Sequence, residues 1–240
     1  MKIGTRWQAS GIHLLLSVLI AVAVLALMLE LWYPTPLFEA AGGNDLLVIL
    51  VGVDVAIGPL ITAVIYKPGK WGLKFDLVVI AVLQLAALAY GCYVVALARP
   101  AFIVFVKDRF EVATPAEVPQ FKNPPLDGPM LVAADIPTDP ERRRKLVEAA
   151  LAGFDLQHFP EYWVPYDQRR AEVLSKAQTI PQLRLAEPAT ARLVDEYLSK
   201  SGKSERDVRY LALRARRAWV AVLIDAKTAE PVKMLLAEKI

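Results

Sequence analysis

The sequence predicts an α+β membrane protein in which three transmembrane helices precede a soluble α+β domain with a C-terminal antiparallel β-meander. Two observations lead to this fold class. Hydrophobic residues make up 55% of the 240 positions, a larger share than ordinary soluble proteins have. The first hundred residues also contain three nearly uncharged stretches of 23, 21 and 22 residues, and about 20 apolar residues suffice to cross the hydrocarbon core of a bilayer.

The three uncharged stretches define a membrane domain over residues 1–99. Its transmembrane helices are expected at about residues 12–31, 46–66 and 77–98. We expect the first helix to stay in place as an anchor, because its apolar run exceeds the ~7–15 residues of a signal peptide core and no A-x-A cleavage site follows it.

Basic residues predict the orientation in the membrane. They lie before the first span and between the second and third: Lys2, Arg6, Lys67, Lys70 and Lys74. The connection over residues 33–45 has no lysine or arginine. The positive-inside rule then places the N-terminus in the cytoplasm. An odd number of spans carries residues 100–240 to the other side, which is the periplasm in a Gram-negative bacterium.

Residues 100–240 predict one compact α+β domain. A β-branched and aromatic run predicts a strand at 101–106, and seven prolines predict a loop over most of 113–140. Helices are expected from the capping segment 138–141 to about 152, and at 166–178 and 189–200. The β-meander is expected at 208–214, 218–225 and 232–236.

Asp54 is the first candidate functional residue. An ionisable group at membrane depth is costly and usually faces a protein interior. Asp54, Gly58 and Thr62 follow one another at intervals of four, so they lie on one helical face. Pro59 removes a backbone donor and predicts a kink. The pattern predicts a small and polar surface that meets another helix.

The third span carries a similar seam. Gln84, Ala87 and Gly91 are spaced by three and four, which again defines one face. Two interpretations are open for both seams: they pack against helices of the same chain, or they receive the helix of a partner. For Asp54 the first interpretation predicts hydrogen bonds to groups such as Gln84 or Thr62.

An aromatic run marks the soluble domain. Four rings and two prolines fall within residues 157–166, and the rings are those of Phe159, Tyr162, Trp163 and Tyr166. Tyrosine and tryptophan dominate the hot spots of protein interfaces, so the run predicts a rigid binding platform. The alternative is that the rings cover the sheet as part of its core.

Several function classes are disfavoured by composition and motifs. A net charge of +3 is too small to indicate nucleic-acid binding. Cys92 is the only cysteine, and the two histidines lie far apart, so we expect no disulfide, metal site or cofactor. The segment from Val51 to Asp54 lacks the Gly-x-Gly-Asp motif of intramembrane aspartyl proteases. Serine-nucleophile and phosphate-loop motifs are absent too, so no catalytic residue is assigned.

The chain resembles the type IV pilin accessory family of bacterial inner-membrane proteins, the TfpX/TfpZ group. The resemblance is dense in the membrane part, in Gly11-Ile12-His13, Trp32-Tyr33-Pro34-x-Pro36-Leu37, Asp54-x-x-x-Gly58-Pro59-Leu60, Tyr66-Lys67-Pro68-Gly69-Lys70, Leu73-Lys74-Phe75-Asp76-Leu77, Gln84-Leu85-Ala86-Ala87-Leu88 and Tyr90-Gly91. It continues more thinly in Asp108-Arg109-Phe110-Glu111-Val112, His158-Phe159-Pro160 and Leu223-x-Asp225-Ala226-Lys227-Thr228.

The resemblance implies an inner-membrane helper of type IV pilus assembly without catalytic residues. Its expected partners are a cognate major type IV pilin, other pilus assembly machinery and the lipid bilayer. The expected partner-binding residues are Asp54, Gly58, Pro59, Thr62, Gln84, Gly91, Phe159, Tyr162, Trp163 and Tyr166. An ion pair between Asp54 and the free amine of a pilin is one further hypothesis. The alternative function is a membrane-embedded enzyme that modifies or processes the pilin.

Overall fold

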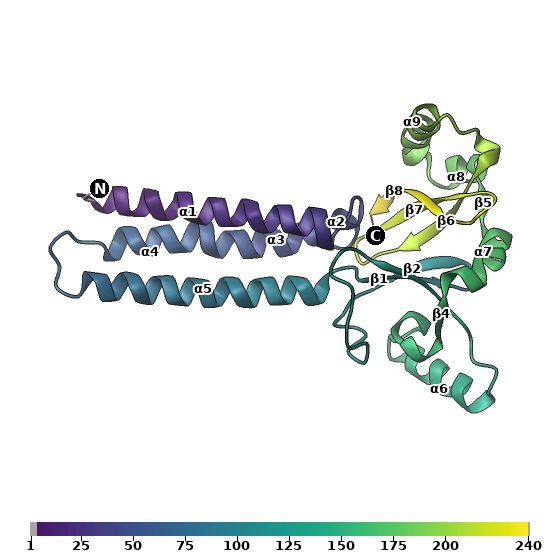
Figure 1. Ribbon diagram of the computed structural model, residues 1–240, viewed down its shortest axis with the longest axis horizontal. Helices are drawn as coiled ribbons and strands as arrows, with labels where there is room; N and C mark the ends of the chain where they lie inside the picture. The colour runs from purple at the N-terminus through teal and green to yellow at the C-terminus, as the bar shows by residue number, and fades with distance from the viewer. Residues whose placement is uncertain (1–3, 240) are drawn as a thin grey trace. The chain divides into compact units, whose positions relative to one another are not determined.

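The computed structural model describes residues 4–239, which form two compact units (Figure 1). The first unit comprises residues 4–30 and 43–97 of the described chain. The second comprises residues 31–42 and 98–239. Lys2, one of the basic residues used above for orientation, lies outside the described residues.

Residues 31–42 belong to the second unit. The domain boundaries predicted from the sequence are wrong here, because residues 1–99 were expected to form one membrane domain. Leu37 and Ala40 of this segment are fully buried in the hydrophobic core of the second unit. The backbone N–H of Arg217 donates to the carbonyl of Ala40 at 2.8 Å. The first connection is therefore a packed piece of the soluble fold.

The first unit consists of three long apolar helices that run side by side (Figure 1). Their most apolar windows have mean hydropathies of 2.9, 2.4 and 2.2, so the three predicted spans are confirmed as helices able to cross a membrane. The first contains α1 (Arg6–Leu27) and η1 (Met28–Trp32), the second α3 (Gly43–Val51), η2 (Gly52–Ile57) and α4 (Gly58–Ile65), and the third α5 (Leu73–Ala98).

Two of these segments, η1 and η2, are π-helical turns. The turn η2 ends just before Pro59, whose ring cannot donate a backbone hydrogen bond to the preceding turn. A π-turn adds a residue to the helical repeat, and such turns occur often at functional sites. The second span therefore has a π-helical turn at this point, and that turn contains Asp54. The kink expected at Pro59 stays a prediction.

The second unit is built on a mixed sheet of eight strands in the order β4-β3-β1-β2-β6-β7-β8, with β5 paired to β6 (Figure 1). Strand β1 is parallel to β3, and β2 is parallel to β6, while the remaining pairs are antiparallel. The bounds are β1 (Phe102–Val106), β2 (Arg109–Ala113), β3 (Met130–Ala134), β4 (Trp163–Pro165), β5 (Gln178–Thr179), β6 (Val208–Arg214), β7 (Ala218–Asp225) and β8 (Pro231–Lys239).

The predicted β-meander is confirmed as β6, β7 and β8. The prediction of a loop over most of 113–140 is wrong in part, because β3 lies within it. Strand β3 has only five residues and is held by parallel pairing with β1, a contact between distant parts of the chain. The apolar run Met130–Ala134 is the local signal of this strand, and the prolines around it obscured that signal.

Short helices cover the sheet or connect its strands. The α-helices are α2 (Leu37–Ala40), α6 (Pro140–Leu151), α7 (Arg170–Lys176), α8 (Ile180–Ala186) and α9 (Ala191–Ser201). The 3-10 helices are η3 (Leu156–His158), η4 (Pro160–Tyr162), η5 (Tyr166–Arg169), η6 (Pro188–Thr190) and η7 (Glu205–Asp207). Helix α6 starts as predicted, because the carboxylate of Asp139 accepts from the N–H of Arg142 at 2.8 Å. Helix α9 ends as predicted at Gly202, whose φ is 67°.

The core of the second unit has three parts. The first lies between the central strands, α7 and the segment 31–42, and Phe105, Phe110 and Leu213 are among its buried side chains. The second joins β1 and β3 to the aromatic run through Phe102 and Leu156, and the third lies under α8 and α9. The aromatic run is therefore attached to the β1–β3 half of the sheet.

Candidate functional site

Polar side chains join the first span to the second. The hydroxyl of Ser10 donates to the carbonyl of Pro59 at 2.9 Å, and Nδ1 of His13 lies 2.6 Å from the hydroxyl of Thr62. Ser10, His13 and Ser17 are spaced by three and four, so they form one polar face of α1. This polar face was not predicted from the sequence, although its spacing of three and four residues indicates a helical face in the same way as the spacing of Asp54 and Thr62.

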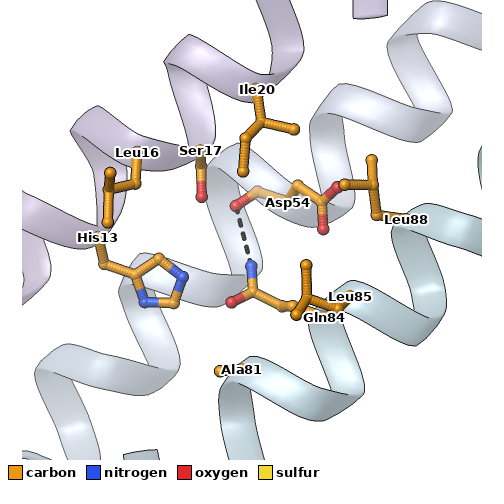
Figure 2. Close-up of a pocket in the computed structure, with 9 residues that line it drawn as sticks. All are labelled: His13, Leu16, Ser17, Ile20, Asp54, Ala81, Gln84, Leu85 and Leu88. Atoms are coloured by element: carbon orange, nitrogen blue, oxygen red, sulfur yellow. Dashed lines mark hydrogen bonds between the residues drawn. The ribbon is translucent and has the colours of Figure 1, made fainter.

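Asp54 lies in η2 with 8% of its surface exposed. Gln84 of α5 donates from Nε2 to the main-chain carbonyl of Asp54 at 3.3 Å (Figure 2). This carbonyl is one turn before Pro59, in the part of the helix where a backbone donor is missing. Among the described residues, Oδ1 of the Asp54 carboxyl group is buried and has no hydrogen-bond partner. Gln84, one of the two expected partners, therefore does bond to Asp54, whereas Thr62 is paired with His13.

A cavity of about 220 Å³ adjoins Asp54 and is bounded by α1, η2 and α5 (Figure 2). Its walls are mainly apolar, and its polar residues all come from different turns of the three spans. The lining residues are His13, Leu16, Ser17, Ile20, Asp54, Ala81, Gln84, Leu85 and Leu88. The cavity can therefore hold an apolar group beside a few polar side chains.

The glycines of the two seams contact residues of the same chain. A Cβ atom on Gly58 would lie 2.0 Å from Nε2 of Gln84, and one on Gly91 would lie 2.2 Å from Cδ1 of Leu50. Each glycine therefore leaves room for a side chain of the neighbouring helix. These contacts match the first interpretation of the seams, packing within the chain. A role of Gly58 or Gly91 in binding a partner stays a prediction.

Serine, histidine and aspartate line the cavity together, which is the set of residue types found in catalytic triads. A triad requires a hydrogen bond from nucleophile to base and another from base to acid. In this structure, Nδ1 of His13 is paired with the hydroxyl of Thr62 instead. Within the described chain, neither Ser17 nor Asp54 is hydrogen-bonded to His13. The three groups are neighbours without the connections of a triad.

The aromatic run is divided between core and surface. The ring of Trp163 packs on Phe102 at a centroid distance of 4.8 Å and on Phe121 at 5.9 Å. Tyr166 is buried, and its hydroxyl donates to the carbonyl of Ala229 at 2.5 Å. Burial raises the pKa of Tyr166 to about 12. These two rings cover the sheet, as the alternative interpretation predicts, and their role in partner binding stays a prediction.

Phe159 and Tyr162 are half-buried, as is Trp163, and their ring centroids lie 6.3 Å apart. Tyr162 also packs against the second core cluster. An open groove of about 560 Å³ lies beside Trp163 along β3 and β4. Its lining residues are Phe121, Met130, Leu131, Val132, Pro160, Trp163, Val164, Pro165, Tyr166, Asp167 and Arg170. The accessible rings of the run are thus the half-buried ones, those of Phe159, Tyr162 and Trp163.

Two charged motifs of the soluble domain have local structural roles. The carboxylate of Asp225 accepts from the backbone N–H groups of Lys227 and Thr228 at 2.9 and 3.2 Å and from Nζ of Lys203 at 2.8 Å. The ammonium group of Lys203 and these N–H groups hold the pKa of Asp225 well below its usual range. The bonds fix the turn between β7 and β8.

Glu111 in β2 is the acid of the second motif, and its side chain is buried. Its carboxyl group accepts from Nε of Arg109 at 2.6 Å. Burial raises the pKa of Glu111, and the Arg109 guanidinium partly offsets that effect. The pair satisfies a buried charge in the sheet. Across the described residues no cluster of three or more histidine, cysteine, aspartate or glutamate side chains has the arrangement of a metal site.

The fold and the cavity define a class: a membrane protein with three transmembrane helices, a polar contact surface between them and a soluble α+β domain. A model of the family described as fimbrial assembly protein FimB matches residues 2–42. The fimbrial assembly protein of serogroup I from Dichelobacter nodosus is 32% identical over 231 residues, which is 90% of each chain. The chain therefore belongs to the fimbrial assembly protein family.

Two further relatives from Dichelobacter nodosus agree with this assignment. The fimbrial assembly protein of serogroup E1 is 34% identical over 187 residues, which is 73% of this chain and 72% of the relative. The protein of serogroups C1 and C2 is 37% identical over 114 residues, which is 46% of this chain and 86% of the relative. No solved structure matches the chain.

The contact between Gly58 and Gln84 generates a prediction about stability. Gly58→Ala should displace the Gln84 side chain and break its hydrogen bond to the Asp54 carbonyl, at a cost of about 1 kcal/mol. In a Gln84→Ala background the same substitution should cost nothing, because the displaced group is gone. Unfolding of the full chain in mixed micelles titrated with SDS measures both effects. Gly52→Ala is the control, since its Cβ would meet no atom within 4 Å; equal losses in both backgrounds would contradict the contact.

Proposed function

We propose that this protein is an inner-membrane accessory factor of type IV pilus assembly that binds a cognate major pilin and stabilises or delivers it. The observation that carries the proposal is the 32% identity to a fimbrial assembly protein over 90% of both chains. Such coverage includes the membrane helices and the soluble domain together. The proposed location is the inner membrane of a Gram-negative bacterium, with the soluble domain in the periplasm.

The two-unit architecture supports binding at two points. A membrane-inserted pilin presents an apolar helix and a soluble head, and this chain has a helical membrane unit and an α+β unit. Two weak contacts on one molecule raise the effective concentration at the second contact once the first has formed. Neither contact then needs high affinity by itself. Other pilus assembly components are further proposed partners.

The alternative function is a membrane-embedded enzyme that modifies the pilin, and one observation favours it. Ser17, His13 and Asp54 line the same cavity. The proposed binding function requires no nucleophile there. Ser17→Ala should leave pilus assembly and pilin capture within about twofold of wild type, because a single buried hydroxyl in an apolar wall contributes little. Counting surface pili and measuring captured pilin in a deletion strain carrying the variant checks this; loss of pili with full capture would favour the enzyme.

The proposed topology generates a prediction for reporter fusions. Lys67, Lys70 and Lys74 lie in or beside the connection between α4 and α5, and they should be cytoplasmic under the positive-inside rule. An alkaline phosphatase fusion after Arg99 should therefore be active, and one after Lys70 inactive. A fusion of a cytoplasmic reporter at the same two positions is the control and should give the opposite pattern. Activity of phosphatase after Lys70 alone would reverse the topology.

The accessible aromatic residues generate a prediction for pilin capture. Wild-type protein purified from membranes should bring the cognate pilin with it. Phe159→Ala and Tyr162→Ala should reduce the recovered pilin at least about tenfold if either ring is a hot spot, which corresponds to ~1.4–2 kcal/mol or more. Leu185→Ala is the control, since Leu185 is an apolar side chain with 83% of its surface exposed on α8. Absence of pilin from the wild-type preparation would overturn the proposed function.

A further inference from the structure

A groove of about 420 Å³ lies between the second and third spans of the first unit. On the second span its lining runs from Val53 to Ile65, and on the third from Phe75 to Ala87. Each stretch covers about 18–20 Å of helix at a rise of ~1.5 Å per residue. The hydrocarbon core of a bilayer is about 30 Å thick, so one leaflet is about 15 Å. The groove therefore has the length of one acyl chain in one leaflet.

The lining of this groove is apolar and open to the surrounding lipid. Ile57, Leu83 and Phe75 line it with 49%, 64% and 72% of their surface exposed. Gly58 and Ala87 contribute little side-chain volume, which leaves space between the two helices. A lipid chain can therefore enter from the side, without an opening of the helix bundle.

Positive charge gathers at one end of the groove. Lys67 and Lys74 lie within two residues of lining positions on the second and third spans, and both are exposed. Nζ of Lys70 contacts Oδ2 of Asp76 at 2.5 Å, which neutralises an acid of the lining. Lys67 and Lys74 form no ion pair within residues 4–239. Two positive charges are therefore left at this end, where Trp71 is 96% exposed, as interfacial tryptophans are.

The other direction along the same helices lacks this charge. A second groove of about 300 Å³ shares Val53 and Ala87 with the first and runs on to Leu46. Leu46 follows an acid, Asp45, so an anionic headgroup is not matched there. A partner helix that crosses the bilayer would occupy both grooves and would give the two lysines no role. Charge complementarity at one end of a groove of leaflet length favours an anionic lipid instead.

We propose that the groove between η2–α4 and α5 binds one anionic phospholipid, with an acyl chain along the apolar lining and the phosphate beside Lys67 and Lys74. The chain of this lipid fills the space between the two spans, next to the contact of Gly58 with Gln84. The bound lipid thus acts as a filler that supports the packing of α5. The proposal goes beyond the proposed function and does not depend on it.

The test uses native mass spectrometry of the purified full-length protein in detergent micelles. Phosphatidylglycerol and phosphatidylcholine with identical acyl chains are the probes, because only the first has a net negative headgroup. Wild type should bind phosphatidylglycerol about tenfold more tightly or better. Lys67→Gln combined with Lys74→Gln should remove this preference. Lys122→Gln combined with Lys176→Gln removes the same charge from exposed positions of the second unit and should keep it.

A second pair of variants tests the groove with every lysine in place, in case the lysine variant inserts differently. Val79→Trp puts an indole into the apolar lining and should weaken phosphatidylglycerol binding about tenfold. Val82→Trp is the matched control, since Val82 is an exposed residue of α5 outside the lining. Equal binding of both lipids by wild type, an unchanged preference in the lysine variant, or equal effects of the two tryptophan substitutions would each overturn the proposal.

The same variants distinguish the lipid from the helix of a partner protein. Pilin recovered with wild type, reduced by Val79→Trp and unaffected by the lysine variant would assign the groove to a partner helix and overturn the lipid site. Absence of pilin from the wild-type preparation would overturn the proposed function alone. Selective binding of phosphatidylglycerol by that preparation would still support the lipid site.

Discussion

Pro59 lacks the N–H that a helix needs, and the arrangement around Asp54 depends on this constraint. No water is available in the hydrocarbon core to replace a missing backbone donor, so the protein must supply one. Gln84 of the third span donates to the Asp54 carbonyl, and it can approach because Gly58 carries no side chain. The missing N–H of Pro59 thus links the π-turn η2, Gly58 and Gln84.

The two units are interleaved in sequence. The chain leaves the membrane unit after Glu30, contributes residues 31–42 to the soluble core, and returns at Gly43 before leaving again at Leu97. Arg99 follows the last crossing and is almost fully buried, with its guanidinium donating to the carbonyls of Pro124 and Pro125. Three covalent connections therefore join the units. Both parts of the soluble unit follow the first span in the sequence.

Short sequence patterns were enough to predict the elements that form through contacts between residues close in the sequence. Charge-free length identified the spans, and alternating apolar residues identified the β-meander with the bounds Val208–Arg214 and Ala218–Asp225. The packed segment 31–42 was not predictable, because it is held by contacts with residues far along the chain. Strand β3 does have a local signal, the apolar run Met130–Ala134, but the prolines around it favour a loop. Asp54 was found from its cost in a bilayer. The polar face of α1, which contains His13, was predictable from spacing, whereas the pairing of Gln84 with Asp54 and of His13 with Thr62 required the positions of the side chains.

The membrane unit and the soluble domain are suited to different parts of recognition. A helix surface with a few small and polar residues, such as the one that contains Gly58 and Gln84, offers little to distinguish one apolar partner helix from another. Half-buried rings such as Phe159 and Tyr162, on a segment fixed to the sheet through Trp163, present a shaped surface. Under the proposed function, the membrane helices would therefore select the class of partner. The soluble domain would then select one pilin within that class.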